Sequence, residues 1–179
     1  MLSSFFLVGI GITSVLSHLV PMLMDRGMSF SDAARCMSTL AAALIFGRII
    51  AGFLMDHLFA PYVTAGFIVF GLAAGVVMLA LGAVGPWAFL AAALVGLATG
   101  SEISEIAYIV GRYFGQCSFG QIYGIMFGAF QLGSAISAPA MGYYYDTVGN
   151  YVGALWVVAA LVLLGALLIA MLSDYPETP

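Results

Sequence analysis

The sequence predicts an all-α, polytopic membrane protein, and three observations carry this prediction. Of the 179 residues, 64% are hydrophobic and only 7% are charged, whereas soluble proteins carry about 25% charged residues. Apolar runs of about twenty residues, the length that crosses roughly 30 Å of hydrocarbon, recur along the chain. Apolar and polar residues do not alternate with a period of two, so the pattern does not favour a β-barrel.

Six apolar segments can be drawn, and short breaks rich in glycine, proline and charge separate them. We expect spans at about 2–24, 36–56, 62–84, 87–111, 119–144 and 151–172, and a polar tail at 173–179. Tight loops make consecutive helices antiparallel neighbours. Both termini and Asp56 are therefore predicted on one side of the membrane, with Asp25 and Asp146 on the other.

The composition and the scattered reactive residues exclude several functions. The four arginines lie one at a time and lysine is absent, so we expect no nucleic-acid partner, which would require clustered cations. Cys36 and Cys117 form no paired motif. His18 and His57 are too far apart to build a metal site with neighbouring carboxylates. We therefore predict no metal, no cofactor and no enzymatic activity.

A motif repeats at half the length of the chain. Gly52 to Asp56 reads Gly-Phe-Leu-Met-Asp and Gly142 to Asp146 reads Gly-Tyr-Tyr-Tyr-Asp, so the two aspartates are 90 residues apart. Each motif ends the second helix of a predicted triplet. Because three crossings is an odd number, the second triplet would be inverted relative to the first, and this predicts a three-plus-three inverted repeat.

Arg48 is the charge that most needs a physical explanation. At about 1.5 Å of rise per residue, it lies roughly 12 Å deeper than Asp56 on the same predicted helix. A cation at that depth costs at least about 2.5 kcal/mol unless it faces a cavity or a partner. Its planar guanidinium could hold a substrate carboxylate through two parallel hydrogen bonds. Alternatively, Arg48 is structural and pairs with a glutamate or with backbone carbonyls.

Glu102 and Glu105 are three residues apart, so they share one face of the fourth predicted helix, and Arg112 follows on that face. A carboxyl group in a dry site can take up and release a proton as access alternates, which makes coupling the functional hypothesis. The alternative, which the late position in the helix favours, is a charge network that clamps neighbouring helices at the cytoplasmic end. With Asp56, these residues are the candidates for coupling or gating.

Two polar residues at other depths are further candidates for substrate binding. His18 could line a pathway or titrate near neutral pH, or it could be a hydrogen-bonded packing residue. Gln131, near the middle of the fifth predicted helix, either faces a cavity or bridges helices. Two stripes of small residues, Ala43-Gly47-Ala51 and Gly120-Gly124-Gly128, predict faces on which helices pack closely.

Several motifs resemble a known family when taken together. The run Gly47 to His57, GRIIAGFLMDH, resembles the loop motif of the major facilitator superfamily, with His57 in place of the usual arginine. His18-Leu19-Val20-Pro21 resembles the seventh helix of its oxalate/formate antiporter and monocarboxylate porter branch. Other segments resemble the same branch: Gly100 to Glu105, Tyr108, Arg112 to Gly115, Phe119 to Gly124, and Tyr145-Asp146 with Gly149 and Tyr151.

The resemblance implies a function and a missing partner. Members of this superfamily have twelve helices in two halves, and this chain resembles the C-terminal half alone. The resemblance implies a secondary transporter that moves small carboxylates or related organic anions by alternating access, with substrate held between the halves. Arg48 would be the anion-binding cation. In oxalate-transporting members a cation is expected in the fifth helix, where this chain has Gln131.

The predicted partners are an anionic small molecule, the lipid bilayer, and a six-helix N-terminal half or a second copy. We expect localisation as a multi-pass protein in the inner (plasma) membrane of a bacterium. The alternative is a membrane assembly subunit without transport of its own, or a truncated remnant of a carrier.

Overall fold

The computed structural model describes residues 1–173 and 175, and all regular structure in this part of the chain is helical. The predicted all-α class is thereby confirmed. The predicted tail at 173–179 lies outside the described residues except for Ser173 and Tyr175. The helices are α1 (Leu2–Asp25), α2 (Phe30–His57), α3 (Ala60–Gly66), the π-helix η1 (Phe67–Ala73), α4 (Ala74–Ala80), α5 (Pro86–Phe114), α6 (Phe119–Val148) and α7 (Val152–Ala170).

The segments α3, η1 and α4 form one continuous helical run, so the described chain has six long runs. Five of them are long and apolar enough to cross a membrane, namely α1, α2, the α3–η1–α4 run, α5 and α7. Helix α6 has 30 residues, more than a crossing needs, but it is not among these five. Five of the six predicted spans therefore have matching apolar helices, and the crossing by α6 stays a prediction.

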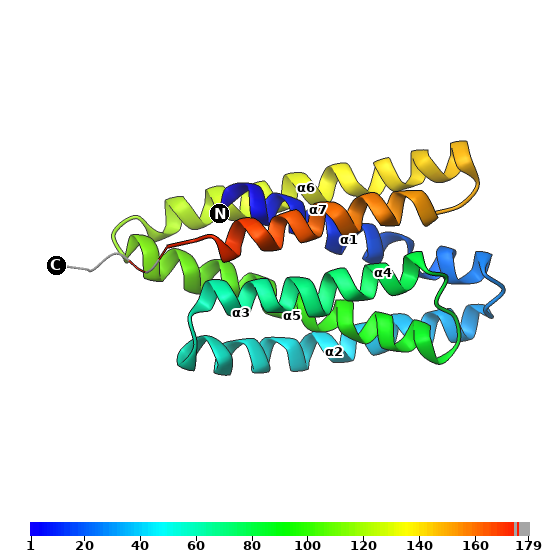
Figure 1. Ribbon diagram of the computed structural model, residues 1–179, viewed down its shortest axis with the longest axis horizontal. Helices are drawn as coiled ribbons and strands as arrows, with labels where there is room; N and C mark the ends of the chain where they lie inside the picture. Colours follow the sequence, from blue (N-terminus) through cyan, green and yellow to red (C-terminus); the bar gives the residue numbers. More distant parts are fainter. Residues whose placement is uncertain (174, 176–179) are drawn as a thin grey trace.

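The runs alternate in direction along the bundle. In Figure 1 the start of α1, the end of α7 and the turns after α2 and α5 lie at one end. The turns after α1, α4 and α6 lie at the opposite end. This arrangement agrees with the predicted sidedness, in which the aspartate that closes α2 lies opposite the aspartates that close α1 and α6.

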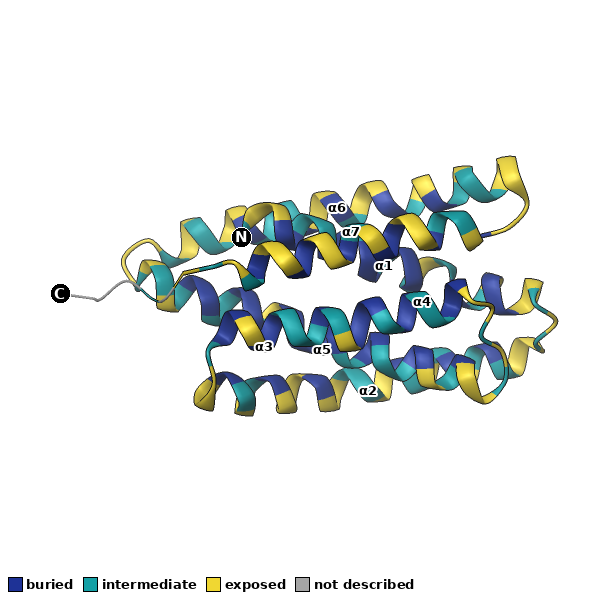
Figure 2. Ribbon diagram, viewed as in Figure 1, coloured by how far each residue is buried: buried dark blue, intermediate teal, exposed yellow. Residues whose placement is uncertain are grey.

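The bundle contains two groups of three runs. Figure 1 shows α1, α6 and α7 in its upper half and α2, α5 and the α3–η1–α4 run in its lower half. Within these groups, α2 packs most extensively on α5, and α1 packs most extensively on α6. Figure 2 shows that the buried residues face the neighbouring helices while much of the outer surface of α2 is exposed.

Glycines allow α2 and α5 to touch backbone to backbone. A Cβ atom on Gly47 would collide with the backbone of Leu97, and one on Gly100 would collide with the backbone of Leu44. Gly96 meets the Leu40 carbonyl in the same way, so residues that touch between these two parallel helices differ by 50 to 56 in number. Close backbone approach through small residues is the usual means of packing helices in lipid.

Helices α1 and α6 approach each other just as closely. A Cβ on Gly9 would collide with the carbonyl of Phe130, and one on Gly133 would collide with the carbonyl of Phe6. A buried serine pair joins the same helices, because the hydroxyl oxygens of Ser14 and Ser137 lie 2.6 Å apart. Serine hydroxyls that face a neighbouring helix are a common way to join membrane helices.

The two stripes of small residues behave differently. The first stripe packs as predicted, since Gly47 touches α5 and Ala51 is fully buried. The second stripe, Gly120-Gly124-Gly128, has no atom of the described chain within 4 Å of where a Cβ would lie. The prediction that this stripe is a packing face is wrong for contacts within this chain, because the α6 face that carries it is not covered by another helix.

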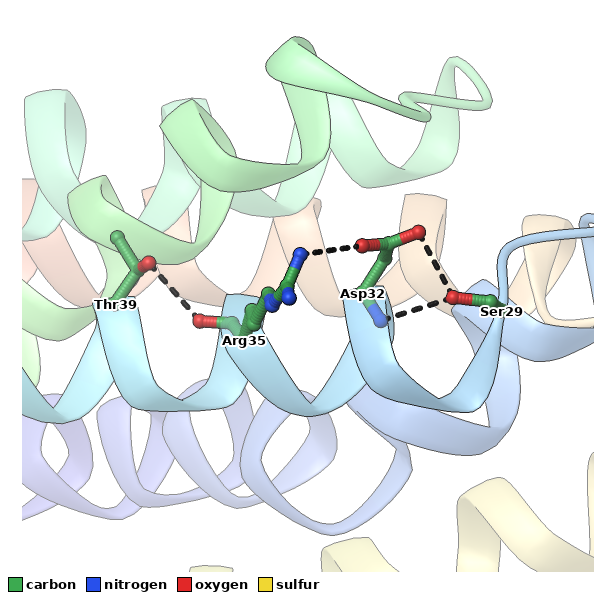
Figure 3. A network of polar contacts seen from close by, with 4 residues as sticks. All are labelled: Ser29, Asp32, Arg35 and Thr39. Atoms are coloured by element: carbon green, nitrogen blue, oxygen red, sulfur yellow. Dashed lines mark hydrogen bonds and ion pairs between the residues drawn. The ribbon is translucent and has the colours of Figure 1, made fainter.

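Helix α2 begins six residues before the predicted span because a polar cap stabilises its first turn. Figure 3 shows the Ser29 hydroxyl oxygen accepting a hydrogen bond from the Asp32 backbone N–H at 3.1 Å and donating one to the Asp32 carboxylate at 2.8 Å. Arg35 pairs with the same carboxylate at 3.3 Å, and the Thr39 hydroxyl donates to the Arg35 carbonyl. Ser-x-x-Asp is a capping pattern, so the sequence contained a signal for this start.

The third run is distorted in its middle. Residues Phe67–Ala73 form a π-helix, which is rare and is found more often at functional positions than elsewhere. Gly71 and Gly75 bring this region against α5, since Cβ atoms there would come within 3 Å of Ala98 and Val95 side-chain atoms. No feature of the sequence predicted the π-helix.

We predict that Gly47→Ala destabilises the bundle, because the added methyl group would meet the backbone of Leu97, which cannot move away as a side chain could. Overpacking of this kind costs about 1 to 3 kcal/mol. Gly52→Ala is the matched control, because it lies on the same helix and nothing lies within 4 Å of its added Cβ. Thermal unfolding in detergent should show a lower midpoint for the first variant only, and equal midpoints would contradict the close α2–α5 contact.

A second prediction concerns sidedness. In a background without Cys36 and Cys117, single cysteines at His57 and Thr147 should react with an impermeant thiol reagent from opposite faces of the membrane, because the ends of α2 and α6 lie at opposite ends of the bundle. Both positions are exposed, so accessibility to the reagent is not limited by burial. Labelling of both from the same face would refute the alternating directions of the runs.

Candidate functional site

The main polar feature inside the bundle is a pair of buried carboxyl groups on α5. Glu102 is 3% exposed and Glu105 is 2% exposed, as expected for two residues on one buried face. The Oε1 atom of each has no hydrogen-bond partner among the described residues. The only ion pair in that part of the chain joins Arg35 to Asp32 at the start of α2, so neither glutamate is matched by a cation. The charge network proposed as the alternative is therefore not formed in the described structure.

Two hydroxyl groups lie beside the Glu105 carboxyl group. One belongs to Ser101, one turn earlier on α5, and the other belongs to Thr64 on α3. Both residues are fully buried. Neither residue was predicted as part of a site, because a single serine or threonine in an apolar helix carries no pattern that distinguishes it from a packing residue.

Arg48 reaches α5 close to this pair. Its Nε donates to the Gly100 carbonyl oxygen at 3.5 Å, two residues before Glu102. The neighbouring Gly47 meets the backbone of Leu97, so this part of α2 lies beside the α5 turn that leads into Glu102. No carboxylate lies within 4 Å of the Arg48 guanidinium among residues 1–173 and 175. Arg48 itself is exposed in this half-bundle, and its one side-chain hydrogen bond within the described residues is the bond to Gly100.

Arg112 and Asp56 lie at the ends of their helices, away from the glutamate pair. The Arg112 guanidinium lies 4.9 Å from the centre of the Tyr175 ring and 5.9 Å from that of Tyr108, which are cation–π distances. It is thus held by aromatic rings rather than by Glu105. Asp56 is exposed on the last turn of α2, where the ring of His57 packs on Phe53.

The end of the chain returns to the same region as Arg112. The Tyr175 hydroxyl accepts a hydrogen bond from the backbone N–H of Ala60 at 3.1 Å, and the Tyr113 hydroxyl donates to the Ser173 carbonyl. Tyr175 also packs edge-on against Phe59 and Tyr113. These contacts connect the ends of α3, α5 and α7. No local pattern predicts them, because they join residues far apart in the chain.

His18 packs between helices in the group of α1, α6 and α7. Its Nε2 lies 3.1 Å from the Ala138 carbonyl oxygen, and its ring lies 5.4 Å from the Tyr151 ring. The half-buried side chain therefore has the contacts expected of the packing alternative. His18 and Arg48 lie in different helix groups and are not brought together within this chain.

Gln131 lies on the outer surface of α6. It is the polar member of a shallow, open depression of about 560 Å³ whose other lining residues are Leu2, Ile125, Gly128, Ala129 and Leu132. A second depression of about 490 Å³ between α2, the α3–η1 segment and α5 is almost entirely apolar and contains none of the predicted site residues. The structure thus provides one buried carboxyl pair with an arginine nearby, and separate positions for His18, Gln131, Asp56 and Arg112.

Residues 1–179 match the sequence pattern described as Major Facilitator Superfamily. The chain belongs to the Major Facilitator Superfamily. Members of this family are transporters and not enzymes, so the predictions of a multi-pass membrane protein and of no enzymatic activity are confirmed. The resemblance to the family is likewise confirmed, whereas the carboxylate-transporting branch stays a prediction.

The fold is similar to that of a solved member of the family. A crystal structure of a variant of the Escherichia coli fucose:proton symporter superposes with a TM-score of 0.71 at 21% sequence identity. The match covers 96% of this chain but 42% of the symporter, so this chain spans less than half the length of that protein. No curated protein matched the sequence.

Proposed function

We propose that this major facilitator chain is one half of a secondary carrier that moves small carboxylates or related organic anions across a bacterial inner membrane. The observation that carries the proposal is Arg48, which lies within an apolar helix, has no carboxylate partner in the described bundle and is exposed. An arginine inside a membrane protein needs a partner or a water-filled cavity. In a complete carrier, the space between the two halves would be the cavity, and an anionic substrate bound there would be the partner.

The chemistry of the guanidinium favours a carboxylate as that substrate. Its planar fork donates two parallel hydrogen bonds that match the two oxygens of a carboxylate, and a low-dielectric surrounding strengthens such a contact. The bond from Nε to the Gly100 carbonyl orients the side chain and leaves the terminal nitrogens for the ligand. A single available cation is better suited to one carboxylate group than to a dianion.

The remaining predicted residues take auxiliary roles in this proposal. Gln131 is exposed on the α6 surface and would offer an amide to a polar part of the substrate. His18 is the third binding candidate, and its hydrogen bond to α6 would make it respond to movement of that helix. Asp56 and Arg112 lie at the same end of the bundle, where contacts with a second half would open and close, and Glu102 and Glu105 are the coupling candidates.

We further propose a three-plus-three inverted repeat, because the packing of one pair of helices resembles that of the other. The residues that touch between α2 and α5 differ by 50 to 56 in number. If residues of α1 and α2 correspond to residues of α5 and α6 at the 90-residue spacing of the two aspartates, touching residues of α1 and α6 should differ by about 124 to 130. The four side-chain hydrogen bonds between α1 and α6 join residues 120 to 127 apart, an overlapping range that supports the proposal.

The proposed partner is a six-helix N-terminal half or a second copy of this chain. Two features support a missing partner: the chain covers 42% of the fucose:proton symporter chain, and the Gly120-Gly124-Gly128 stripe has nothing packed on it. Alternating access requires two bundles that rock against each other around the substrate. A single bundle provides one wall of that site.

We predict that changes at Arg48 reduce the affinity of the complete carrier for carboxylates. Arg48→Lys keeps the charge but loses the two-pronged geometry, so affinity should fall, and Arg48→Gln should abolish anion binding. A charge-assisted hydrogen bond contributes about 1.5 to 3 kcal/mol, which corresponds to roughly ten- to hundredfold in affinity. Binding titrations on folded, membrane-inserted protein measure the effect.

Arg35→Gln is the matched control for this experiment, because Arg35 is an exposed arginine on the same helix that already pairs with Asp32. It should leave carboxylate affinity unchanged. If Arg48→Gln also leaves it unchanged, Arg48 is a structural arginine, and His18 and Gln131 become the next residues to test.

A further prediction is that the 179-residue chain alone does not transport. Reconstituted into liposomes, it should take up no carboxylate unless a six-helix partner is supplied or the chain forms dimers. Uptake should be measured together with oligomeric state, by crosslinking or single-molecule counting in the same vesicles. Uptake by demonstrable monomers would contradict the requirement for a second bundle, and inactivity in the presence of both kinds of partner would favour the assembly subunit or the remnant.

A further inference from the structure

The buried oxygen atoms between α3 and α5 have chemistry that the proposed anion site does not use. Glu102 Oε1, Glu105 Oε1 and Thr64 Oγ1 are buried side-chain atoms without a hydrogen-bond partner among the described residues. They are the only side-chain atoms of this kind in that part of the chain. Buried polar atoms are normally paired, so a cluster of three unpaired oxygens needs an explanation.

Thr64 is unusual among the helical hydroxyl groups. Thr39, Thr99 and Thr147 all donate to the carbonyl oxygen of the residue four positions earlier, which is how hydroxyl groups are commonly satisfied in apolar helices. Thr64 makes no such bond although it is fully buried. Its oxygen lies instead beside the Glu105 carboxyl group, across the contact between α3 and α5.

Ser101 completes the group. Its hydroxyl donates to the Ala98 carbonyl at 2.9 Å, so the hydrogen is already used and the oxygen lone pairs are free to face Glu105. All four side chains therefore present oxygen atoms, and two of them are carboxylates. The π-helix η1 begins three residues after Thr64, so the backbone beside this group is also distorted.

Inside the bundle each of the two carboxyl groups must either carry a proton or lie beside a cation. A comparison of stability in sodium and in choline at constant pH distinguishes these two states. Arg48 cannot neutralise them by direct contact, because its guanidinium is more than 4 Å from either carboxylate. Two carboxylates buried without a cation are strongly unfavourable.

We propose that Glu102, Glu105, Thr64 and Ser101 form a binding site for one sodium ion between α3 and α5. Sodium is a hard cation and takes oxygen ligands, in the manner of other hard cations. The group lacks the three or more histidine, cysteine or acidic ligands of a transition-metal site, and no such cluster occurs among residues 1–173 and 175. The site is independent of the carboxylate proposed above, because it lies within this half-bundle and needs no residue from a second half.

The ion would also connect two parts of the bundle that substrate movement is expected to affect. Its ligands come from α5, which contacts Arg48 through Gly100, and from α3, which leads into the distorted η1 segment. Binding of the cation would hold these helices together, and its release would loosen them. Discontinuous or distorted helices commonly provide the ion sites of secondary transporters.

The test uses the purified 179-residue chain in lipid nanodiscs, without any carboxylate substrate. Thermal unfolding is followed in NaCl and in choline chloride at equal ionic strength and constant pH, and sodium binding is measured by titration calorimetry. Sodium at ten times its dissociation constant should raise the unfolding midpoint by about 3 to 6 °C. Choline should not raise the unfolding midpoint, because this cation is too large to be bound closely by the oxygen atoms of the site.

Variants distinguish sodium binding at this site from a general effect of salt on the unfolding midpoint. Glu105→Gln, Glu102→Gln and Thr64→Val should each weaken sodium binding at least tenfold and remove the midpoint shift, even where the variant itself is more stable than the parent. Thr64→Ser, which keeps the oxygen, should bind within about threefold of the parent. Asp146→Asn is the control for loss of an acidic group, because Asp146 is exposed at the end of α6, and it should keep the full shift.

Two results would overturn the proposal. The first is an unfolding midpoint that is the same in sodium and in choline for the parent chain, with no heat of sodium binding. The second is a sodium-dependent shift that persists in both glutamine variants. Neither result bears on the proposed transport of carboxylates, which is tested separately through Arg48.

Discussion

The contact between α2 and α5 determines where the charged groups of this half-bundle lie. Because Gly47, Gly96 and Gly100 carry no side chain at the contact, the two backbones touch and the helices are fixed in register. That register brings Arg48 to the Gly100 carbonyl, two residues before Glu102. A larger residue at any of these glycines would move the cation away from the carboxyl pair, so the packing and the electrostatics of the site depend on the same contact.

Burial in a membrane explains why the chain has so few charged residues and why each of them makes a different kind of contact. Arg35 pairs with Asp32 at the surface, and Arg112 lies over the rings of Tyr175 and Tyr108. A surface ion pair such as Arg35–Asp32 contributes little to the free energy of unfolding. Glu102 and Glu105 have no such partner among the described residues. An ionisable residue without a partner inside a membrane protein is a strong indication of function.

Much of the fold was predictable from the sequence because the bilayer imposes helix length and direction. The predicted end of the first span and the predicted start of the fourth agree with the structure, since α1 ends at Asp25 and α5 begins at Pro86, whereas α6 continues to Val148, past the predicted end at 144. The start of α2 was placed too late, since the acidic and basic residues near Asp32 resemble a loop and yet form a helix cap. The π-helix was not predictable, because it results from how the third run packs on α5 rather than from its own residues.

The candidate site was predictable in part, and the limit has a physical cause. Spacing along one helix identified Glu102 and Glu105 as neighbours, since residues three apart share a face whatever the tertiary structure. The spacing also favoured pairing with Arg112, but the Arg112 guanidinium instead lies over the ring of Tyr175, which follows α7. This contact joins distant parts of the chain. Thr64 was not found for the same reason, because only the packing of α3 on α5 brings its oxygen to Glu105. Local patterns therefore identify the charges of such a bundle, whereas their partners depend on helix contacts that must be seen in three dimensions.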